Sequence, residues 1–362
     1  MNKKIRRTLG TVGLISAILF TGCGVASSSP APAAPEGKTA ETTTETTTET
    51  TADYKWEADL PALDGALCGA PLYIAYENGY FAEEGVKVTL ISADSETRKV
   101  GLNNGSIPIT NGDFQFFPSI ESGVEVSVID GLHNGCIKLV VKPDSPIQKA
   151  EDLKGLTIGV DEIGGTPYQV ASVWLENAGI SAAASAGEVT FVAFSDGSLE
   201  LEALKNGDID VAAMWDPLAS VAEKAGSVRT ILNITTDEPF AGKYCCFIYG
   251  SNKVLKEDPE EIYAMLRAIR KAQDFISKNP EEAVNIIIEG KYSQIEDKDL
   301  AIELITSYEY PSEETRKSNS QNTKENVLYF SKALNNIGYL KTPADEFIEK
   351  AYFDISDEDL SK

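Results

Sequence analysis

A single histidine, His133, lies three residues before Cys136 in the stretch GLHNGCIKLVV. Together with Cys68, Cys245 and Cys246 it supplies the imidazole and thiol groups that bind zinc or copper. No C-x-x-C or H-x-x-H spacing accompanies these residues. Because adjacent residues of a strand face opposite sides, at most one of Cys245 and Cys246 is expected to point toward the other sulfurs.

Three interpretations of these residues therefore stay open. In the favoured one, His133 makes one hydrogen bond beside a ligand cleft and the cysteines are small buried hydrophobes. In the second, an exported metal-binding protein uses His133 and the cysteines. In the third, Cys68 and Cys136 form a disulfide, which is compatible with an exported protein. The favoured interpretation predicts no metal site and no cofactor.

The first residues of the chain predict where the protein is located. Basic residues precede an apolar run from Leu9 to Phe20, which is too short to span a bilayer and suits an export signal. The run ends in LFTGC, which resembles a bacterial lipobox. We expect residues 1–22 to be a lipoprotein signal peptide and Cys23 to be lipidated, anchoring the protein to the outer face of the cell membrane.

Composition then separates a tether from a folded body. Residues 23–53 are rich in Ala, Pro, Ser, Thr and Glu and have no apolar periodicity, so we expect a disordered tether. The body from residue 54 onward has roughly 300 residues, enough for two lobes of ordinary domain size. The net charge of −24 makes nucleic acid a poor partner.

Four strand ends in the body lead through small residues into a helix start. They read ALCGAP, TNGDFQ, EIGGTP and WDP, and in the third Thr166 is expected to be the N-cap residue before Pro167. In an open α/β sheet, ligands bind outside the carboxyl ends of strands, where helix N-termini present free N–H groups. No G-x-S-x-G, H-E-x-x-H or P-loop motif accompanies these turns. They predict a binding cleft.

Three longer motifs carry a family resemblance. ENGYFAEEGVKV, DLKGLTIGV and NGDIDVAAMWDP resemble the nitrate/sulfonate/taurine/bicarbonate family of ABC-transporter substrate-binding lipoproteins. The resemblance covers nearly all of the chain after the tether. It implies an α/β periplasmic-binding-protein type II fold, with two α/β lobes joined by two crossover strands around a ligand cleft. Lobe 1 would comprise residues 54–143 and 251–362, and lobe 2 residues 144–250, with the crossovers near VVKPDSPI and YCCFIYGSN.

The resemblance also places the ligand contacts on the same turns. Trp215 is read either as core or as an apolar wall of the pocket, and Asp216 either as a ligand contact or as a helix cap. With His133 beside the cleft, the predicted ligand-binding residues are Cys68, Gly69, Asn111, Gly112, Asp113, His133, Gly164, Gly165, Thr166, Tyr168, Ser195, Asp196, Trp215 and Asp216.

The predicted function is capture of a small solute by lobe closure and its delivery to an ABC permease with its ATPase subunits. The resemblance implies a monomer that performs no chemistry. An enzyme on the same fold, related to those that make pyrimidine or menaquinone precursors, is the alternative from another class. The cleft lacks an obvious Arg or Lys pair for an oxyanion, and its aspartates favour a zwitterion or a cation, while Trp215 favours an organic molecule.

Overall fold

The computed structural model of the chain describes residues 54–62, 65–316 and 319–361. The predicted signal peptide (1–22), the lipidation site Cys23 and the tether (23–53) lie outside these residues. Among the described residues, no helix is long and apolar enough to cross a membrane.

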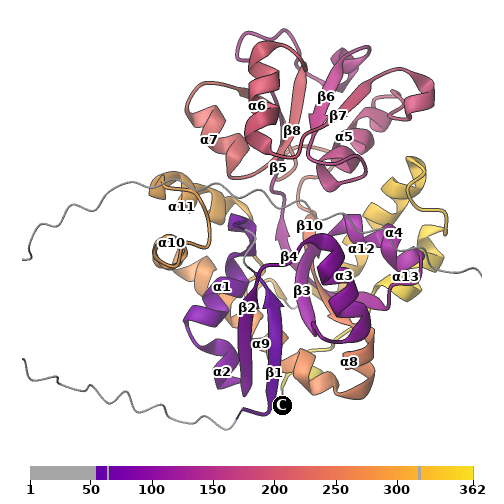
Figure 1. Cartoon of the computed structure of the whole chain (residues 1–362). Coiled ribbons are helices and arrows are strands. Elements are labelled where there is room, and N and C mark those ends of the chain that lie inside the picture. The colour runs from indigo at the N-terminus through magenta and orange to yellow at the C-terminus, as the bar shows by residue number, and fades with distance from the viewer. Residues whose placement is uncertain (1–53, 63–64, 317–318, 362) are drawn as a thin grey trace, which may run out of the picture. The chain divides into compact units, whose positions relative to one another are not determined.

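Sheets with helices packed around them form the two predicted α/β lobes, a two-stranded and a three-stranded sheet in the first and a five-stranded sheet in the second (Figure 1). In the first lobe, β10 (Tyr244–Ser251) lies between β3 (Ile109–Asp113) and β4 (Val126–Asn134) and is antiparallel to both. A parallel pair, β1 (Trp56–Pro61) and β2 (Val86–Ile91), lies beside this sheet and contacts β3. The central position of β10 means that a late segment of the chain completes the first lobe.

The second lobe is built on a mixed sheet. Its strand order is β7-β6-β8-β5-β9, in which β6 is parallel to β7 and β8 whereas β5 is antiparallel to β8 and β9. β5, which is antiparallel to both of its neighbours, is the strand that directly follows the first-lobe strand β4 in the chain. The five strands are β5 (Ile137–Val141), β6 (Thr157–Val160), β7 (Thr190–Ala193), β8 (Val211–Trp215) and β9 (Arg229–Asn233).

Most helices begin and end where the sequence places proline and glycine. Pro71 lies in the first turn of α1, and Gly207 ends α6 in the left-handed conformation with φ of 84°. The lobe 2 helices are α5 (Thr166–Asn177), α6 (Gly197–Asn206) and α7 (Leu218–Lys224). Those of lobe 1 are α1 (Ala70–Glu77), α2 (Tyr80–Glu83), α3 (Ser95–Asn104), α4 (Phe117–Glu121), α8 (Asn252–Glu257), α9 (Pro259–Lys278), α10 (Pro280–Glu289), α11 (Lys298–Ser307), α12 (Asn319–Asn336) and α13 (Ala344–Ala351).

The chain passes between the lobes earlier than the sequence predicts. β4 ends at Asn134 and β5 begins at Ile137, so the crossing consists of Gly135 and Cys136 and precedes the predicted boundary at 143. On the return, β10 already belongs to the first sheet from Tyr244, whereas the prediction kept residues up to 250 in lobe 2. An apolar run such as CIKLVV predicts a buried strand but not the sheet that it joins, because the strand partners are distant in sequence.

The pairing of β10 with β4 is interrupted at the crossing. Cys246 lies opposite His133 and Tyr244 opposite Asn134, so Cys245 is an extra residue in β10. Such a bulge breaks the alternation of side chains along a strand and re-aims the residues beside it. The end of β4, where the chain leaves the first lobe, is therefore paired irregularly with the start of β10, where the chain returns to it.

A buried ion pair fastens α9 to β4. The Arg270 guanidinium donates through Nε to Asp130 Oδ2 at 2.7 Å, and the Asp130 side chain is only 3% exposed. Its other oxygen accepts from the backbone N–H of Gly131 at 2.9 Å. A carboxylate so enclosed stabilises the fold only while its partner is present, because removing one member leaves a buried charge without compensation.

We therefore expect Asp130→Ala to lower the free energy of unfolding by about 3 kcal/mol, because Arg270 loses its buried counter-charge. The matched control is Glu57→Ala, which removes an exposed pair with Lys87 and should cost less than about 1 kcal/mol. Urea unfolding of both variants tests this difference. Equal losses would show that burial of the Asp130 pair has no bearing on stability.

Candidate functional site

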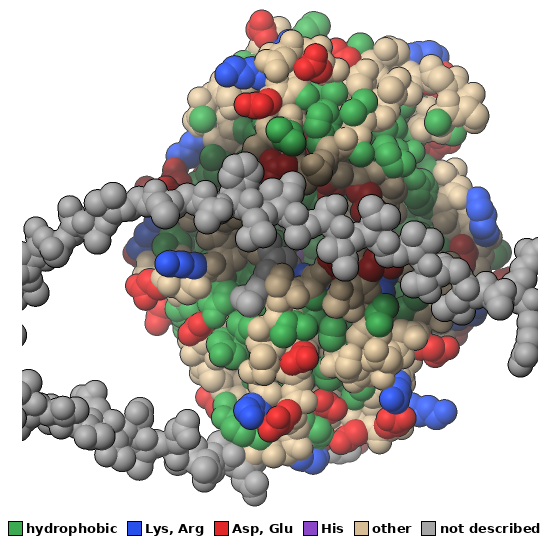
Figure 2. All heavy atoms as spheres, viewed as in Figure 1, with side chains coloured by type: hydrophobic (Ala, Val, Ile, Leu, Met, Phe, Trp, Pro, Cys, Tyr) green, Lys and Arg blue, Asp and Glu red, His purple; other side chains and the backbone are tan. Residues whose placement is uncertain are grey.

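A pocket of about 510 Å³ lies between the lobes and is lined from both. Its volume is in the range that holds a small organic molecule. Figure 2 shows acidic side chains in red within the recess between the lobes. The first lobe contributes Gly65, Ala66, Cys68, Ala93, Asp94, Ser95, Arg98, Asn111, Gly112, Asp113, Gln115, Phe116 and Cys246; the second contributes Asp161, Gly197, Glu200, Ala213, Met214, Trp215, Asp216, Pro217 and Leu218.

The predicted turns supply part of this lining. The first turn contributes Cys68 from a short 3-10 helix (Leu67–Gly69) in which Gly69 is buried beside the Tyr73 ring. The carboxyl end of β3 contributes all three residues predicted there, and the end of β8 with the residue that follows it contributes both of those predicted there. The predicted residues in the lining are thus Cys68, Asn111, Gly112, Asp113, Trp215 and Asp216.

Residues of the EIGGTP turn lie beside the pocket, where the lobes touch. Thr166 is the first residue of α5 and Gly165 takes the N-cap position, so the predicted cap at Thr166 is wrong. The Thr166 hydroxyl instead donates to Asp113 Oδ1 in the first lobe at 2.6 Å. The Tyr168 ring lies 5.7 Å from that of Tyr339, also in the first lobe. Gly164, with φ of 92°, lies beside the same Tyr339 ring.

The remaining predicted positions do not line the pocket. Asp196 is exposed and caps α6, accepting from the backbone N–H of Ser198 at 2.7 Å, and Ser195 is exposed beside it. His133 is fully buried. Its Nδ1 lies 2.6 Å from the carbonyl oxygen of Asn134, and its ring packs against Tyr308.

The sequence prediction missed the turn that follows β2. There Asp94 caps α3 through the backbone N–H of Thr97 at 2.7 Å, and Ser95 and Arg98 in the first turns of the helix line the pocket. The segment ISADSET has the same form as the four turns that were identified, so the signal was present in the sequence. Glu200, one turn into α6, carries no such signal.

Carboxyl groups dominate the polar lining. Asp94 and Asp161 are exposed, whereas Asp113, Glu200 and Asp216 are buried. Among the lining residues that the structure describes, Arg98 is the one basic side chain, and it donates to Ala93 O at 3.0 Å and to Asn111 Oδ1 at 3.1 Å. An arrangement of this kind favours a ligand that donates hydrogen bonds or carries positive charge.

Burial changes the proton affinity of these acids. It raises the pKa of Asp113 to about 6, against the opposing hydrogen bonds from Thr166 and Gln115. It also raises the pKa of Glu200 to about 8, and the nearby charge of Asp161 adds to this rise. The pKa of Asp216 is raised by burial and lowered by the charge of Lys138, with burial the larger effect. At neutral pH the pocket therefore holds both ionised and protonated carboxyl groups.

Two aromatic side chains and two polar atoms complete the lining. Trp215 is half-buried and its indole Nε1 donates to Asp161 Oδ2 at 2.8 Å, while Phe116 lines the pocket from the other lobe. Within the described part of the chain, the lining atoms Ser95 Oγ and Glu200 Oε1 make no hydrogen bond. Pro217 takes the N-cap position of α7, so the predicted cap at Asp216 is wrong, although Asp216 accepts from the Ser220 backbone N–H at 3.2 Å.

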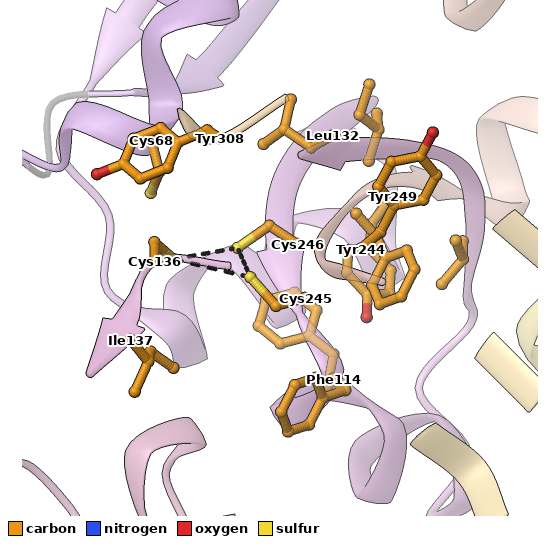
Figure 3. Close-up of a cluster of buried hydrophobic side chains, with 14 of the residues drawn as sticks. Cys68, Phe114, Leu132, Cys136, Ile137, Tyr244, Cys245, Cys246, Tyr249 and Tyr308 are labelled. Carbon is orange, nitrogen blue, oxygen red and sulfur yellow. Dashed lines mark hydrogen bonds between the residues drawn. The ribbon is translucent and has the colours of Figure 1, made fainter. Parts of the chain in front are cut away.

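Next to the pocket the cysteines gather into a cluster of sulfur atoms (Figure 3). Cys136 Sγ lies 3.8 Å from Cys245 Sγ and 3.9 Å from Cys246 Sγ, and the last two are 3.6 Å apart. The expectation that at most one of Cys245 and Cys246 faces the other sulfurs is therefore wrong, because the bulge at Cys245 breaks the strand alternation. Cys68, Cys136, Cys245 and Cys246 are all free thiols, so the Cys68–Cys136 disulfide is absent from the described part of the chain.

The raised pKa of Glu200 predicts how stability depends on pH. Between its ordinary pKa of 4.5 and its folded value of about 8, the native chain holds a proton that the unfolded chain releases. The contribution of Glu200 to the free energy of unfolding should therefore fall as the pH rises from about 5 to 8, with a slope approaching 1.4 kcal/mol per pH unit. Glu200→Gln should remove this part of the slope.

Urea unfolding at several pH values measures the effect. The control is Glu202→Gln, since Glu202 is exposed on the same helix and its substitution should leave the pH profile unchanged. Identical profiles for the unsubstituted chain and Glu200→Gln would contradict the assignment.

Comparisons with known proteins identify relatives of this chain. The chain is 27% identical over 199 residues to a putative binding protein of Brucella abortus, covering 54% of this chain and 59% of the relative. The chain thus spans only about 59% of the length of the first curated relatives that it matches. It is 26% identical over 259 residues to the formylaminopyrimidine-binding protein of Halalkalibacterium halodurans, covering 67% of this chain and 74% of that protein.

A third relative is named as an enzyme. It is the 4-amino-5-hydroxymethyl-2-methylpyrimidine phosphate synthase of Aspergillus parasiticus, 25% identical over 245 residues, covering 61% of this chain and 67% of the relative. At least one protein that is similar to this chain is thus named for catalysis.

A solved structure confirms the predicted fold. The alkanesulfonate-binding protein SsuA of Xanthomonas axonopodis pv. citri, bound to MOPS, matches with a TM-score of 0.64 at 15% identity, covering 84% of this chain and 99% of that one. At this identity the likeness shows the periplasmic-binding-protein fold. The family model described as "NMT1/THI5 like" matches residues 69–283. The resemblance seen in the sequence motifs is thereby confirmed, and the chain belongs to the NMT1/THI5-like family.

Proposed function

We propose that this protein is the extracytoplasmic solute-binding component of an ABC importer. The observation that carries the proposal is the pocket of about 510 Å³, to which both lobes contribute polar and aromatic side chains. Membership of the NMT1/THI5-like family supports it, as do the relatives named for binding rather than catalysis. The permease and its ATPase subunits are the partners that this role requires.

The solute is a small planar organic molecule with N–H donors or a positive charge, of the aminopyrimidine type. Carboxyl groups of the lining can accept hydrogen bonds from such donors, and Trp215 and Phe116 offer apolar surface to a ring. The unpartnered atoms Ser95 Oγ and Glu200 Oε1 would take part. A bare oxyanion such as nitrate fits poorly, because the acidic side chains around Arg98 would repel it.

Capture uses closure of the two lobes on the solute. The lobes are joined through Gly135 and Cys136 on one path and through residues 234–243 on the other, and motion about these segments opens the pocket. The bond from Thr166 to Asp113 holds the lobes together beside the solute. The predicted lipid at Cys23 and the tether keep the protein close to the permease, at a high effective concentration.

The role is binding without chemistry. His133 is enclosed away from the pocket lining, so it is not placed to act on a bound solute as an acid or a base. The synthase named among the relatives makes turnover the opposing hypothesis. Recovery of the bound molecule unchanged after incubation distinguishes the two.

Thermal unfolding of the full chain against formylaminopyrimidine, other aminopyrimidines, taurine, alkanesulfonates and nitrate tests the solute class. An aminopyrimidine at 100 times its Kd should stabilise the folded chain by about 2.7 kcal/mol. Stabilisation by nitrate or alkanesulfonates alone would contradict the proposed class, and chemical conversion of the solute would contradict binding without chemistry.

Asp113→Asn should weaken aminopyrimidine binding by about 10- to 100-fold, because a hydrogen bond to a charged acceptor is lost. Since burial places the pKa of Asp113 at about 6, affinity in the unsubstituted chain should fall as the pH drops below that value. The Asn variant should lack this dependence. Isothermal titration calorimetry at pH 5 to 8 measures both effects. Ser195→Ala, outside the lining, is the control and should bind normally.

A further inference from the structure

The sulfur cluster beside the solute pocket has the composition of a metal centre. We propose that Cys136, Cys245, Cys246 and His133 bind a thiophilic divalent cation, for which Zn²⁺ is the representative. One ligand atom from each residue lies within 4.8 Å of every other. Three sulfurs and one imidazole nitrogen match the three-cysteine, one-histidine set of structural zinc sites. The site adjoins the solute pocket, to whose lining Cys246 belongs, but the proposal does not rest on the proposed transport function.

The sulfur spacing fits a tetrahedral ion. The three Sγ–Sγ distances are 3.6, 3.8 and 3.9 Å, so the sulfurs form a nearly equilateral triangle. A tetrahedral zinc ion with Zn–S bonds of about 2.3 Å requires its sulfurs to lie about 3.8 Å apart. A disulfide would instead require about 2.05 Å. The sulfur triangle is thus already one face of the expected coordination polyhedron.

His133 is prepared to supply the fourth ligand. Its Nδ1 lies 2.6 Å from the carbonyl oxygen of Asn134, a contact that places the proton on Nδ1 and leaves the lone pair on Nε2. Within the described part of the chain, Nε2 is buried and makes no hydrogen bond. Metal-binding histidines commonly donate their other N–H to a backbone carbonyl in this way. A buried nitrogen without a partner is costly, and a metal ion would satisfy it.

The backbone explains why these residues converge. Cys245 is the extra residue of the bulge in β10, so it and Cys246 both face Cys136. Cys136 belongs to the link between β4 and β5, and His133 lies at the end of β4 opposite Cys246. A metal bound here would tie the strand that leaves the first lobe to the strand that returns to it.

Burial indicates a closed, structural site. His133 and Cys136 are 0% exposed, Cys245 is 1% and Cys246 is 6% exposed. The rings of Tyr308 and Tyr310 pack against the imidazole at 5.2 and 5.6 Å. Structural zinc sites have four protein ligands and add directly to folding stability. The bound ion should accordingly raise the unfolding temperature without any solute present.

Cys68 provides a matched control. It is a free thiol, is 7% exposed, and lies near the cluster on the 3-10 helix Leu67–Gly69. It does not belong to the set of four residues whose ligand atoms are mutually close. The proposal therefore makes Cys68 dispensable for metal binding, although it is the same residue type in the same surroundings.

The test uses the full chain with Cys23→Ala, so that the one cysteine outside the described residues contributes no thiol. The reduced protein is incubated with Zn²⁺, desalted and analysed for zinc by mass spectrometry. We expect one zinc per chain, a rise in unfolding temperature, and charge-transfer absorption typical of tetrahedral cobalt thiolates when Co²⁺ replaces Zn²⁺. Cys136→Ser and His133→Ala should each lose at least ten-fold in zinc affinity, while Cys68→Ser should retain it.

Two outcomes would overturn the proposal. One is a folded, reduced chain that retains less than a tenth of an equivalent of zinc and gives no cobalt–thiolate absorption, a result that depends on no variant. The other is a loss of zinc affinity in Cys68→Ser as large as that in Cys136→Ser. Asp113→Asn, which alters the solute pocket, should load zinc normally, so failure of the proposed transport function leaves this test unaffected.

Discussion

The interrupted pairing of β10 with β4 is the constraint on which the rest of the molecule depends. A regular antiparallel ladder at this point would direct Cys245 and Cys246 to opposite faces of the sheet. The bulge instead turns both sulfurs toward Cys136. Because the chain leaves the first lobe immediately after this pairing, the irregularity lies next to the crossing that leads into β5 and the second lobe.

In the pocket beside this crossing, burial changes which carboxyl groups are ionised, so the net charge of the whole chain does not describe the charge of the pocket. A surplus of acidic residues gives the chain a net charge of −24, which by itself would attract any cation. Inside the pocket, burial holds Glu200 largely protonated near neutral pH and leaves Asp113 mostly ionised. The pocket therefore offers hydrogen-bond donors and acceptors within a short distance, and it discriminates by their arrangement as well as by net charge.

The parts of the structure that the sequence predicted are those governed by local rules. Proline and glycine located α1 and α6, and the strand-to-helix turns located Asn111, Gly112, Asp113, Trp215 and Asp216 in the pocket lining. The apolar residues of α9 recur at helical spacing in the sequence and pack in the core: Phe275 is half-buried, and the buried ones are Ile262, Met265, Leu266, Ile269, Ala272 and Ile276.

Features set by distant partners could not be predicted. The sheet that β5 joins, the bulge at Cys245 and the entry of Glu200 into the pocket all depend on packing between segments far apart in sequence. Asp258 shows the same effect on a small scale: it takes the N-cap position of α9 without a side-chain cap bond, and its carboxylate accepts from Trp56 Nε1 at 2.8 Å across 202 residues.

The construction of the pocket from separate turns has an evolutionary consequence. Each turn contributes a few side chains, and most of the core that packs the sheets behind them consists of other residues. A lineage can therefore exchange one turn's side chains and acquire a new solute while the scaffold keeps its stability. Gene duplication followed by such exchanges would generate a set of receptors with unrelated cargoes from one ancestral chain, and sequence divergence among them would concentrate at the ends of strands.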